Sequence, residues 1–245
     1  MRLDVALTSR GISRSRNQAA RLIQQGSVTV NGQTQTKPSH LVLESDAIEA
    51  NQVMAVSRAG GKLSFALEEF GVTPSGVCLD VGASTGGFTE VLLGAGAGKV
   101  IAIDVGHDQL SPELQLDPRV VNVEGTNVRE LTLSQLKKIA PEKPSLVAVD
   151  LSFISLTVVA KKLLELAQGA ELVILIKPQF ELSKEKLRAG VVKVDSDREA
   201  AKNKVLAAFS ELGAEVSGVC VSPIVGTKGN TEFLAHLRQG SKPKL

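Results

Sequence analysis

Tryptophan and tyrosine are absent from this chain of 245 residues, and phenylalanine occurs only seven times. Proteins that bind single-stranded nucleic acids usually stack the bases on aromatic rings. With so few rings, any nucleic acid partner should be held through its shape and through phosphate contacts.

Cysteine and histidine are also scarce, with two and three residues. Cys78 and Cys220 each lie in an apolar run without paired spacing, and His40, His107 and His236 form no ligand pattern. The sequence therefore predicts buried, reduced thiols and no metal site.

Long apolar runs are missing as well. None approaches the roughly 18 residues that a membrane-spanning helix requires, and the start Met1-Arg2-Leu3-Asp4 differs from the basic and then apolar order of a signal peptide. Apolar residues make up 43% and charged residues 22%, as in ordinary globular proteins. We expect a cytoplasmic protein that does not enter a membrane.

The net charge of +2 is unevenly distributed. In residues 1–40 six basic side chains face one acid, Asp4, so this segment carries +5 and the remainder −3. A polyanion should bind at the N-terminus, although a solvated basic face on a small domain would give the same count. The expected contacts are Arg2, Arg14, Arg16 and Lys37.

The first 50 residues predict a compact α+β module. A helix is expected from Ser13 to Gln25, followed by a hairpin in which Val28-Thr29-Val30 leads into Asn31-Gly32. We place this domain at residues 1–50, a linker at 51–61, where Ala59-Gly60-Gly61 loosens the chain, and a second domain at 62–240.

The sequence of the second domain predicts a Rossmann-like α/β fold with a mostly parallel, doubly wound sheet. Near-continuous apolar strands are expected at residues 77–81, 100–104, 120–124, 146–150, 172–176 and 216–221. They alternate with helices near residues 87–93, 156–167 and 197–212, and a last segment covers 232–237. This alternation is typical of a parallel sheet covered on both faces.

Ligands bind such sheets at the carboxyl ends of the strands. The first strand ends in a glycine-rich turn that lets a ligand approach the backbone at a helix N-terminus, and Asp104 follows the second strand where a carboxylate can bind ribose hydroxyls. The turn has no Lys or Arg for a pyrophosphate, which favours an adenosine cofactor without phosphates. Its residues are Asp80, Gly82, Ser84, Thr85, Gly86, Gly87 and Phe88.

Two further strands end in charged residues, Asp150 and Lys177. They could form a structural ion pair. Alternatively, a desolvated lysine beside another cation can act as a base near neutral pH, and Lys62 is a candidate for that second cation.

Several stretches of the sequence, taken together, are specific to one family. They include Ser13 to Arg16, Asn31-Gly32, Asp80 to Thr89, Asp104 to Gly106, Asp150 to Leu156, Ile176 to Glu181, Gly190 to Val192 and Gly229 to Leu234. Through them the chain resembles, over nearly its whole length, the TlyA (hemolysin-A-type) family of ribosomal RNA ribose 2′-O-methyltransferases. The similarity implies an αL RNA-binding domain followed by an FtsJ-like methyltransferase domain.

The resemblance implies a catalytic set of Lys62, Asp150, Lys177 and Glu232, with S-adenosylmethionine as the cofactor. It adds Val105, Asn127 and Asp150 to the cofactor contacts. Lys177 is the expected base for the poorly acidic ribose hydroxyl, Asp150 should orient its amine and the cofactor methyl, and Glu232 should orient Lys62 or the ribose.

The expected partner is ribosomal RNA within a ribosomal subunit, with a weak preference for the large subunit, and we expect a monomer. Three alternatives remain. They are an NAD-type oxidoreductase, against which the missing Gly-x-Gly-x-x-Gly argues, a non-catalytic RNA-binding ribosome assembly factor, and a membrane-active hemolysin, for which no amphipathic cationic helix is found.

Overall fold

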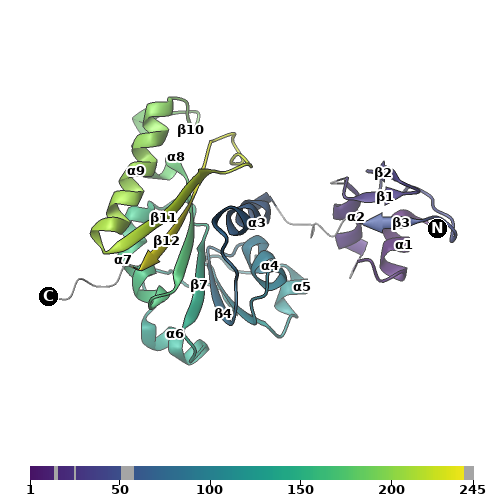
Figure 1. Ribbon diagram of the computed structural model, residues 1–245, viewed down its shortest axis with the longest axis horizontal. Coiled ribbons are helices and arrows are strands. Elements are labelled where there is room, and N and C mark those ends of the chain that lie inside the picture. The colour runs from purple at the N-terminus through teal and green to yellow at the C-terminus, as the bar shows by residue number, and fades with distance from the viewer. Residues whose placement is uncertain (14–15, 25, 51–57, 240–245) are drawn as a thin grey trace. The chain divides into compact units, whose positions relative to one another are not determined.

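The computed structural model describes residues 1–13, 16–24, 26–50 and 58–239 (Figure 1). The chain divides into two compact units, Met1–Ser57 and Arg58–Leu245. Residues 51–57 of the expected linker lie outside the described residues.

The first unit packs two short helices, α1 (Leu3–Ser9) and α2 (Arg16–Gln24), against a small sheet. The sheet has the order β2-β1-β3, with β1 at Val28–Val30, β2 at Gln33–Gln35 and β3 at Ile48–Ala50. Asn31 and Gly32 have φ angles of 51° and 78°, so they form the tight left-handed turn that their pairing predicts between β1 and β2.

The expected helix from Ser13 to Gln25 corresponds to α2, although residues 14, 15 and 25 lie outside the described part of the chain. The Ser13 hydroxyl lies 3.2 Å from the Thr8 hydroxyl. Helix α1 was not expected from the sequence. It forms because Leu3, Ala6 and Leu7 share one face and are buried in the core of the unit.

The second unit is built on a seven-stranded sheet of order β11-β12-β8-β7-β4-β5-β6. The strands β8, β7, β4, β5 and β6 are mutually parallel, and β12 pairs antiparallel with both β8 and β11. The mostly parallel sheet agrees with the sequence-based prediction. The strands are β4 (Val77–Val81), β5 (Lys99–Ile103), β6 (Val120–Val123), β7 (Pro144–Val149), β8 (Glu171–Ile176), β11 (Ala214–Val221) and β12 (Phe233–Gln239).

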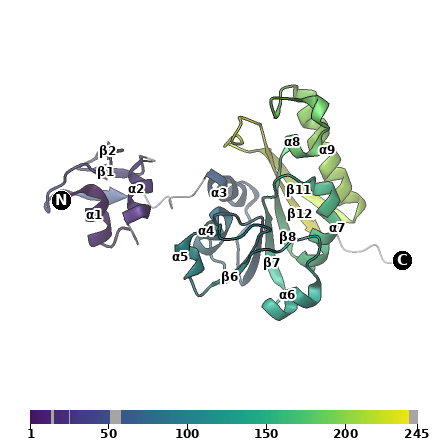
Figure 2. The same cartoon turned by 180° about the vertical axis from the view of Figure 1, so that it is seen from behind.

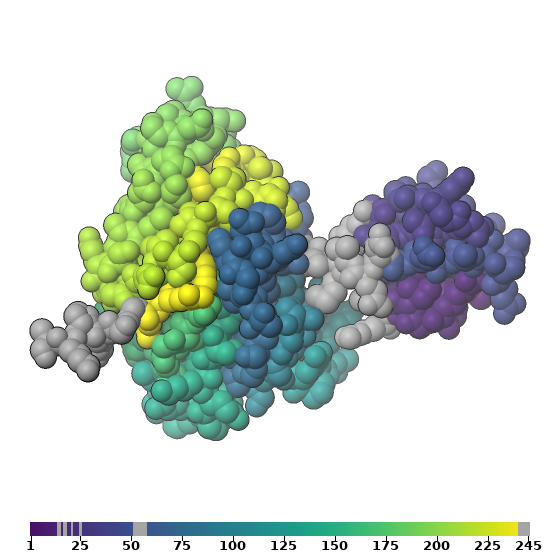
Figure 3. Space-filling model, viewed as in Figure 1, coloured from purple at the N-terminus to yellow at the C-terminus, as the bar shows by residue number. Residues whose placement is uncertain are grey.

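Helices cover both faces of this sheet, as Figures 1 and 2 show. Helix α3 (Arg58–Phe70) contacts β12 and α4 (Gly87–Gly94), and α4 contacts β4 and β5. Figure 3 shows the blue surface of α3 beside the yellow-green surface of the last strands. On the other face, α7 (Leu156–Ala167) contacts β7 and β8, and α9 (Asp195–Glu211) contacts β11 and α7.

Smaller elements connect these layers. Helices α5 (Pro112–Gln115), α6 (Leu133–Ile139) and α8 (Pro178–Glu181), the 3₁₀ turn Lys184–Lys186 and the hairpin β9 (Leu187–Arg188) and β10 (Val191–Val192) were not expected. They are too short for hydrophobic periodicity to reveal.

Residues 58–61, which the sequence assigned to the linker, form the first turn of α3. The two glycines serve packing here rather than flexibility. Gly60 is buried, and a Cβ on Gly61 would lie 2.7 Å from Cδ1 of Ile224. A second difference concerns Cys220, which is only partly buried because it lies on the edge strand β11, whereas Cys78 is buried as expected.

Candidate functional site

The candidate site lies where β4, β7 and β8 end side by side. The glycine-rich turn follows β4, Asp150 follows β7 and Lys177 follows β8, so three segments far apart in sequence meet at one edge of the sheet. They enclose a cavity of about 160 Å³, lined by Ala59, Gly82, Ala83, Ser84, Thr85, Gly87, Phe88, Asp150, Ser152 and Lys177.

Glycine is required at two positions of this turn. Gly82 and Gly86 have φ angles of 92° and 94°. A Cβ on Gly82 would collide with the carbonyl oxygen of Asp150, and one on Gly86 would collide with the side chain of Leu114. The turn is therefore free of side chains at these two positions, which lets a ligand approach the backbone near the N-terminus of α4.

Asp104 braces this turn from the neighbouring strand. Its Oδ2 accepts a hydrogen bond of 2.8 Å from the Ser84 N–H, and its Oδ1 accepts one of 2.7 Å from the Gly106 N–H. Each oxygen has a further lone pair to accept a ribose hydroxyl. Val105 follows with an exposed side chain.

Five of the expected cofactor residues do not line the cavity, namely Asp80, Gly86, Asp104, Val105 and Asn127. Asp80 is fully buried beneath the turn, where the Thr89 hydroxyl donates a 2.6 Å hydrogen bond to its Oδ2, and burial raises the pKa of Asp80 to about 7. Asn127 accepts a hydrogen bond from the Arg129 N–H and lines a separate cavity of about 440 Å³ beyond β6. Neither side chain lines the cavity between the three strands.

The four residues expected to be catalytic form two ion pairs. Lys177 Nζ lies 2.5 Å from Asp150 Oδ1 and donates a 2.9 Å hydrogen bond to the Ser152 hydroxyl. Lys62 Nζ lies 2.6 Å from Glu232 Oε2. The positive charge of Lys62 is therefore neutralised by Glu232, whereas the sequence had suggested Lys62 as an unpaired second cation beside Lys177.

The sheet register explains why Glu232 joins this group. Phe233 of β12 pairs with Ile176 of β8 in the antiparallel register, so the preceding residue, Glu232, lies at the same end of the sheet as Lys177. The Gln179 amide donates to the second oxygen of Glu232 at 3.4 Å and links the two strand ends.

Phe153 is an exposed ring near the charged pair that the sequence did not single out. Its side chain is 91% exposed, and its φ angle of 64° lies in the left-handed region, which costs a side chain about 1–3 kcal/mol. Its ring lies 5.2 Å from that of Phe180, whose centroid is 6.0 Å from Lys177 Nζ. The small number of aromatic residues gave no reason to expect an exposed ring beside the charged pair.

Two of the four expected RNA contacts of the first unit share one carboxylate. Arg2 donates to Asp4 at 3.0 and 3.1 Å, and Arg16 donates to it at 3.1 Å. The hydrogen bonds from Arg2 lower the pKa of Asp4 to about 2. Lys37 is exposed, and Arg14 lies outside the described residues.

Within the described ranges, no three side chains of His, Cys, Asp or Glu come together in a way that could hold a metal ion. No helix of that same part of the chain is long and apolar enough to cross a membrane.

Comparison with known families gives two matches. The FtsJ-like methyltransferase family matches residues 55–239, and the S4 domain matches residues 1–48.

Two curated relatives match almost the whole chain. The chain is 41% identical to Hemolysin A of Brachyspira hyodysenteriae, over 96% of this chain and 99% of the relative. It is 43% identical to the 16S/23S rRNA (cytidine-2'-O)-methyltransferase TlyA of Mycobacterium tuberculosis (strain ATCC 25618 / H37Rv), over 97% and 89% of the two chains.

Solved structures agree with these matches. A hemolysin-like protein from Streptococcus thermophilus superposes with a TM-score of 0.73 at 36% identity, covering 99% of this chain and 90% of that one. A similar protein from Lactococcus lactis gives a TM-score of 0.72 at 42% identity, over 75% and 88%.

Proposed function

Since the chain belongs to the TlyA (hemolysin A) family of FtsJ-like methyltransferases, we propose that it methylates a ribose 2′-hydroxyl of ribosomal RNA with S-adenosylmethionine. The observation that carries the proposal is the ion pair of Lys177 with Asp150 in the wall of the cavity of the glycine-rich turn, with the pair of Lys62 and Glu232 at the same end of the sheet.

The groups at and beside the cavity suit S-adenosylmethionine. The bare backbone at Gly82 and Gly86 admits a ligand close to the main chain, and Asp104 is positioned to accept the ribose hydroxyls. The turn contains no Lys or Arg that a pyrophosphate would need. When bound, S-adenosylmethionine supplies a methyl group on a positively charged sulfur, which an oxygen nucleophile can take.

The residues of this chain prepare that nucleophile. Lys177 is the base in this proposal, and its amine takes the proton of the 2′-hydroxyl, which leaves the oxygen with the electron pair for the new bond. The resulting ammonium is stabilised by Asp150, 2.5 Å away, and is oriented by the Ser152 hydroxyl. Lys62, held by Glu232, supplies a fixed positive charge near the developing oxygen anion.

The first unit would deliver the RNA. Asp4 holds the guanidinium groups of Arg2 and Arg16 in fixed positions, which favours recognition of phosphates by shape. The exposed Phe153 ring offers a surface on which one unstacked base could lie beside Lys177. All four proposed catalytic side chains come from one chain, so the site requires no second copy.

Transfer of labelled methyl from S-adenosylmethionine to purified 30S and 50S ribosomal subunits tests the proposal. We expect label in RNA, at a ribose that resists alkaline cleavage on its 3′ side. Label in protein, or in a base, would contradict ribose methylation, and a Lys177→Ala variant provides the inactive control.

A further inference from the structure

We propose that the β9–β10 hairpin of the second unit is an additional RNA-binding surface, which holds phosphates near the target nucleotide. The inference rests on the proposed function and deepens it, because it places a substrate contact on the unit that carries the chemistry. The surface consists of four exposed cations, named here the basic hairpin cluster: Lys184, Arg188, Lys193 and Lys228.

The cluster stands out against the charge of its unit. Residues 58–245 contain equal numbers of acidic and basic side chains, whereas residues 183–193 contain four basic residues and one acid, Glu185. Neighbouring cations are neutralised, since Lys186 pairs with Asp197 and Arg198 with Asp195.

The members of the basic hairpin cluster form no ion pair with any carboxylate in the described part of the chain. Like charges gathered without partners repel one another, so their concentration at one place favours a polyanion partner.

The backbone presents these cations on a rigid support. Ala189 and Gly190 have φ angles of 52° and 79°, which makes a tight two-residue turn between β9 and β10. Lys228 comes from a different loop and lies across this turn, with its Nζ 3.4 Å from the position of a Cβ on Gly190. Two separate segments therefore contribute to one basic surface.

A buried amide connects the hairpin to the proposed catalytic residues. Asn230 is 2% exposed, and it accepts a 2.9 Å hydrogen bond from the Val192 N–H and donates a 3.0 Å hydrogen bond to the Gly190 carbonyl. Two residues further along the chain, Glu232 pairs with Lys62.

The hairpin is also fixed from the side of Lys177. Helix α8, which begins directly after Lys177, contacts β10, and Figure 1 shows β10 beside α8 and α9. A phosphate bound to the cluster would therefore keep a constant distance from both ion pairs. Since the proposed substrate is a ribose, whose nearest anionic groups are its own phosphates, RNA is the partner that this arrangement fits.

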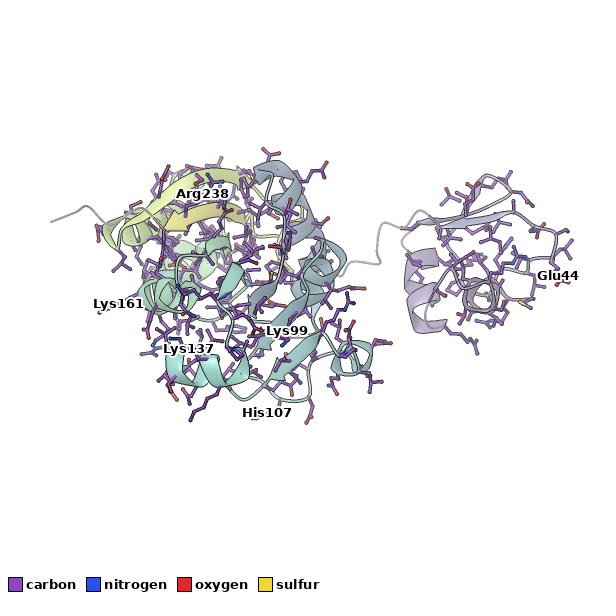
Figure 4. All side chains as sticks on the ribbon, turned by 60° about the horizontal axis from the view of Figure 1, so that its bottom comes forward. Glu44, Lys99, His107, Lys137, Lys161 and Arg238 are labelled. Carbon is purple, nitrogen blue, oxygen red and sulfur yellow. The ribbon has the colours of Figure 1, made fainter. Side chains whose placement is uncertain are left out.

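The test compares two triple variants of the full chain. One carries Arg188→Ala, Lys193→Ala and Lys228→Ala. The control carries Lys137→Ala, Lys143→Ala and Lys161→Ala, which removes the same charge from exposed positions of the same unit. Figure 4 shows Lys137 and Lys161 at the side of α6 and α7. The probe is protein-free 23S ribosomal RNA, and its affinity is measured over a series of KCl concentrations.

In the hairpin variant we expect the slope of log affinity against log salt to become shallower by about 2–3, because three phosphate contacts are lost. Methyl transfer with subsaturating RNA should fall accordingly, whereas S-adenosylmethionine affinity should not change. The control should keep the wild-type slope. A hairpin variant with the wild-type slope, or equal losses in both variants, would overturn the proposal.

The two proposals fail separately in this experiment, because RNA binding is measured without methyl transfer. If the wild-type protein binds the RNA through the hairpin but methylates no ribose, the proposed reaction is wrong and the binding surface stands. If methyl transfer to RNA occurs with identical salt slopes, the reaction stands and the hairpin surface is wrong.

Discussion

Separating Lys62 from Glu232 should destabilise the second unit strongly, and removing both charges together should not. The side chains are only 9% and 3% exposed, and their charged atoms lie 2.6 Å apart. Lys62→Met leaves a buried carboxylate without its cation, and Glu232→Leu leaves a buried ammonium without its anion. Breaking such a pair costs about 3–5 kcal/mol, which corresponds to a fall in Tm of about 6–20 °C for a domain of this size.

The double variant Lys62→Met with Glu232→Leu should recover most of this loss, because two apolar side chains of similar volume replace the pair and no charge stays buried. All three variants should lose methyl transfer. Unfolding must be followed by far-ultraviolet circular dichroism or calorimetry, since the chain has no tryptophan or tyrosine to report by fluorescence. The cycle then gives the coupling between the two positions.

Two outcomes would refute this reasoning. If the double variant loses as much free energy of unfolding as the two single variants together, the two charges do not stabilise each other. If the double variant transfers methyl groups at the wild-type rate, Lys62 and Glu232 do not belong to the catalytic set, whatever their effect on stability.

Four other perturbations test separate parts of the site. Lys177→Arg keeps the charge but cannot release a proton near neutral pH, so single-turnover transfer should be lost while both substrates still bind; substantial activity would contradict the role as base. Asp104→Ala should weaken S-adenosylmethionine binding by about 1–3 kcal/mol in calorimetry, and unchanged affinity would exclude it as a ribose acceptor. Because burial raises the pKa of Asp80 to about 7, the folded protein holds this proton more tightly than the unfolded chain, and the free energy of unfolding should decrease between about pH 4 and pH 7. In thermal unfolding, Asp80→Asn should reduce that decrease. The same pH dependence of stability in the variant and the wild type would contradict the raised pKa. Arg2→Ala with Arg16→Ala should reduce the salt slope of RNA binding by about 2 without changing cofactor affinity, and an unchanged slope would remove this face from RNA binding.

The sheet could be predicted from the sequence because each buried parallel strand is an apolar run between turn signals. The direction of β12 could not. The composition of the short segment after Glu232 does not show whether the strand runs parallel or antiparallel to its neighbours. Its direction is defined by its antiparallel pairing with both β8 and β11. That pairing also places Glu232 at the site, whereas the sequence had singled this residue out through the family resemblance alone.

The sequence predicts which strand ends meet at the site, but it does not predict all the contacts that the side chains make there. Asp150 and Lys177 follow neighbouring strands, so their proximity was a consequence of the fold. Asp80 precedes the glycine-rich turn in sequence, yet every residue of β4 is buried, and its carboxylate points into the core toward Thr89. Its position next to the turn suggested that Asp80 contacts the cofactor. Spacing along the sequence, however, does not show which face of a buried strand a side chain occupies.

The buried pair of Lys62 and Glu232 is better explained by chemistry than by folding. A buried ion pair contributes little net stability, because the cost of removing two charges from water offsets their attraction, and apolar side chains often do as well. Lys62 comes from α3 and Glu232 from the entry to β12, so the fold holds two distant segments together at a point where hydrophobic contacts would suffice. The antiparallel register sets this pair at the same sheet end as Lys177 and Asp150. Two ion pairs at one end of the sheet are unfavourable for a core, and in the reaction we propose they would stabilise the ribose oxygen as it gives up its proton.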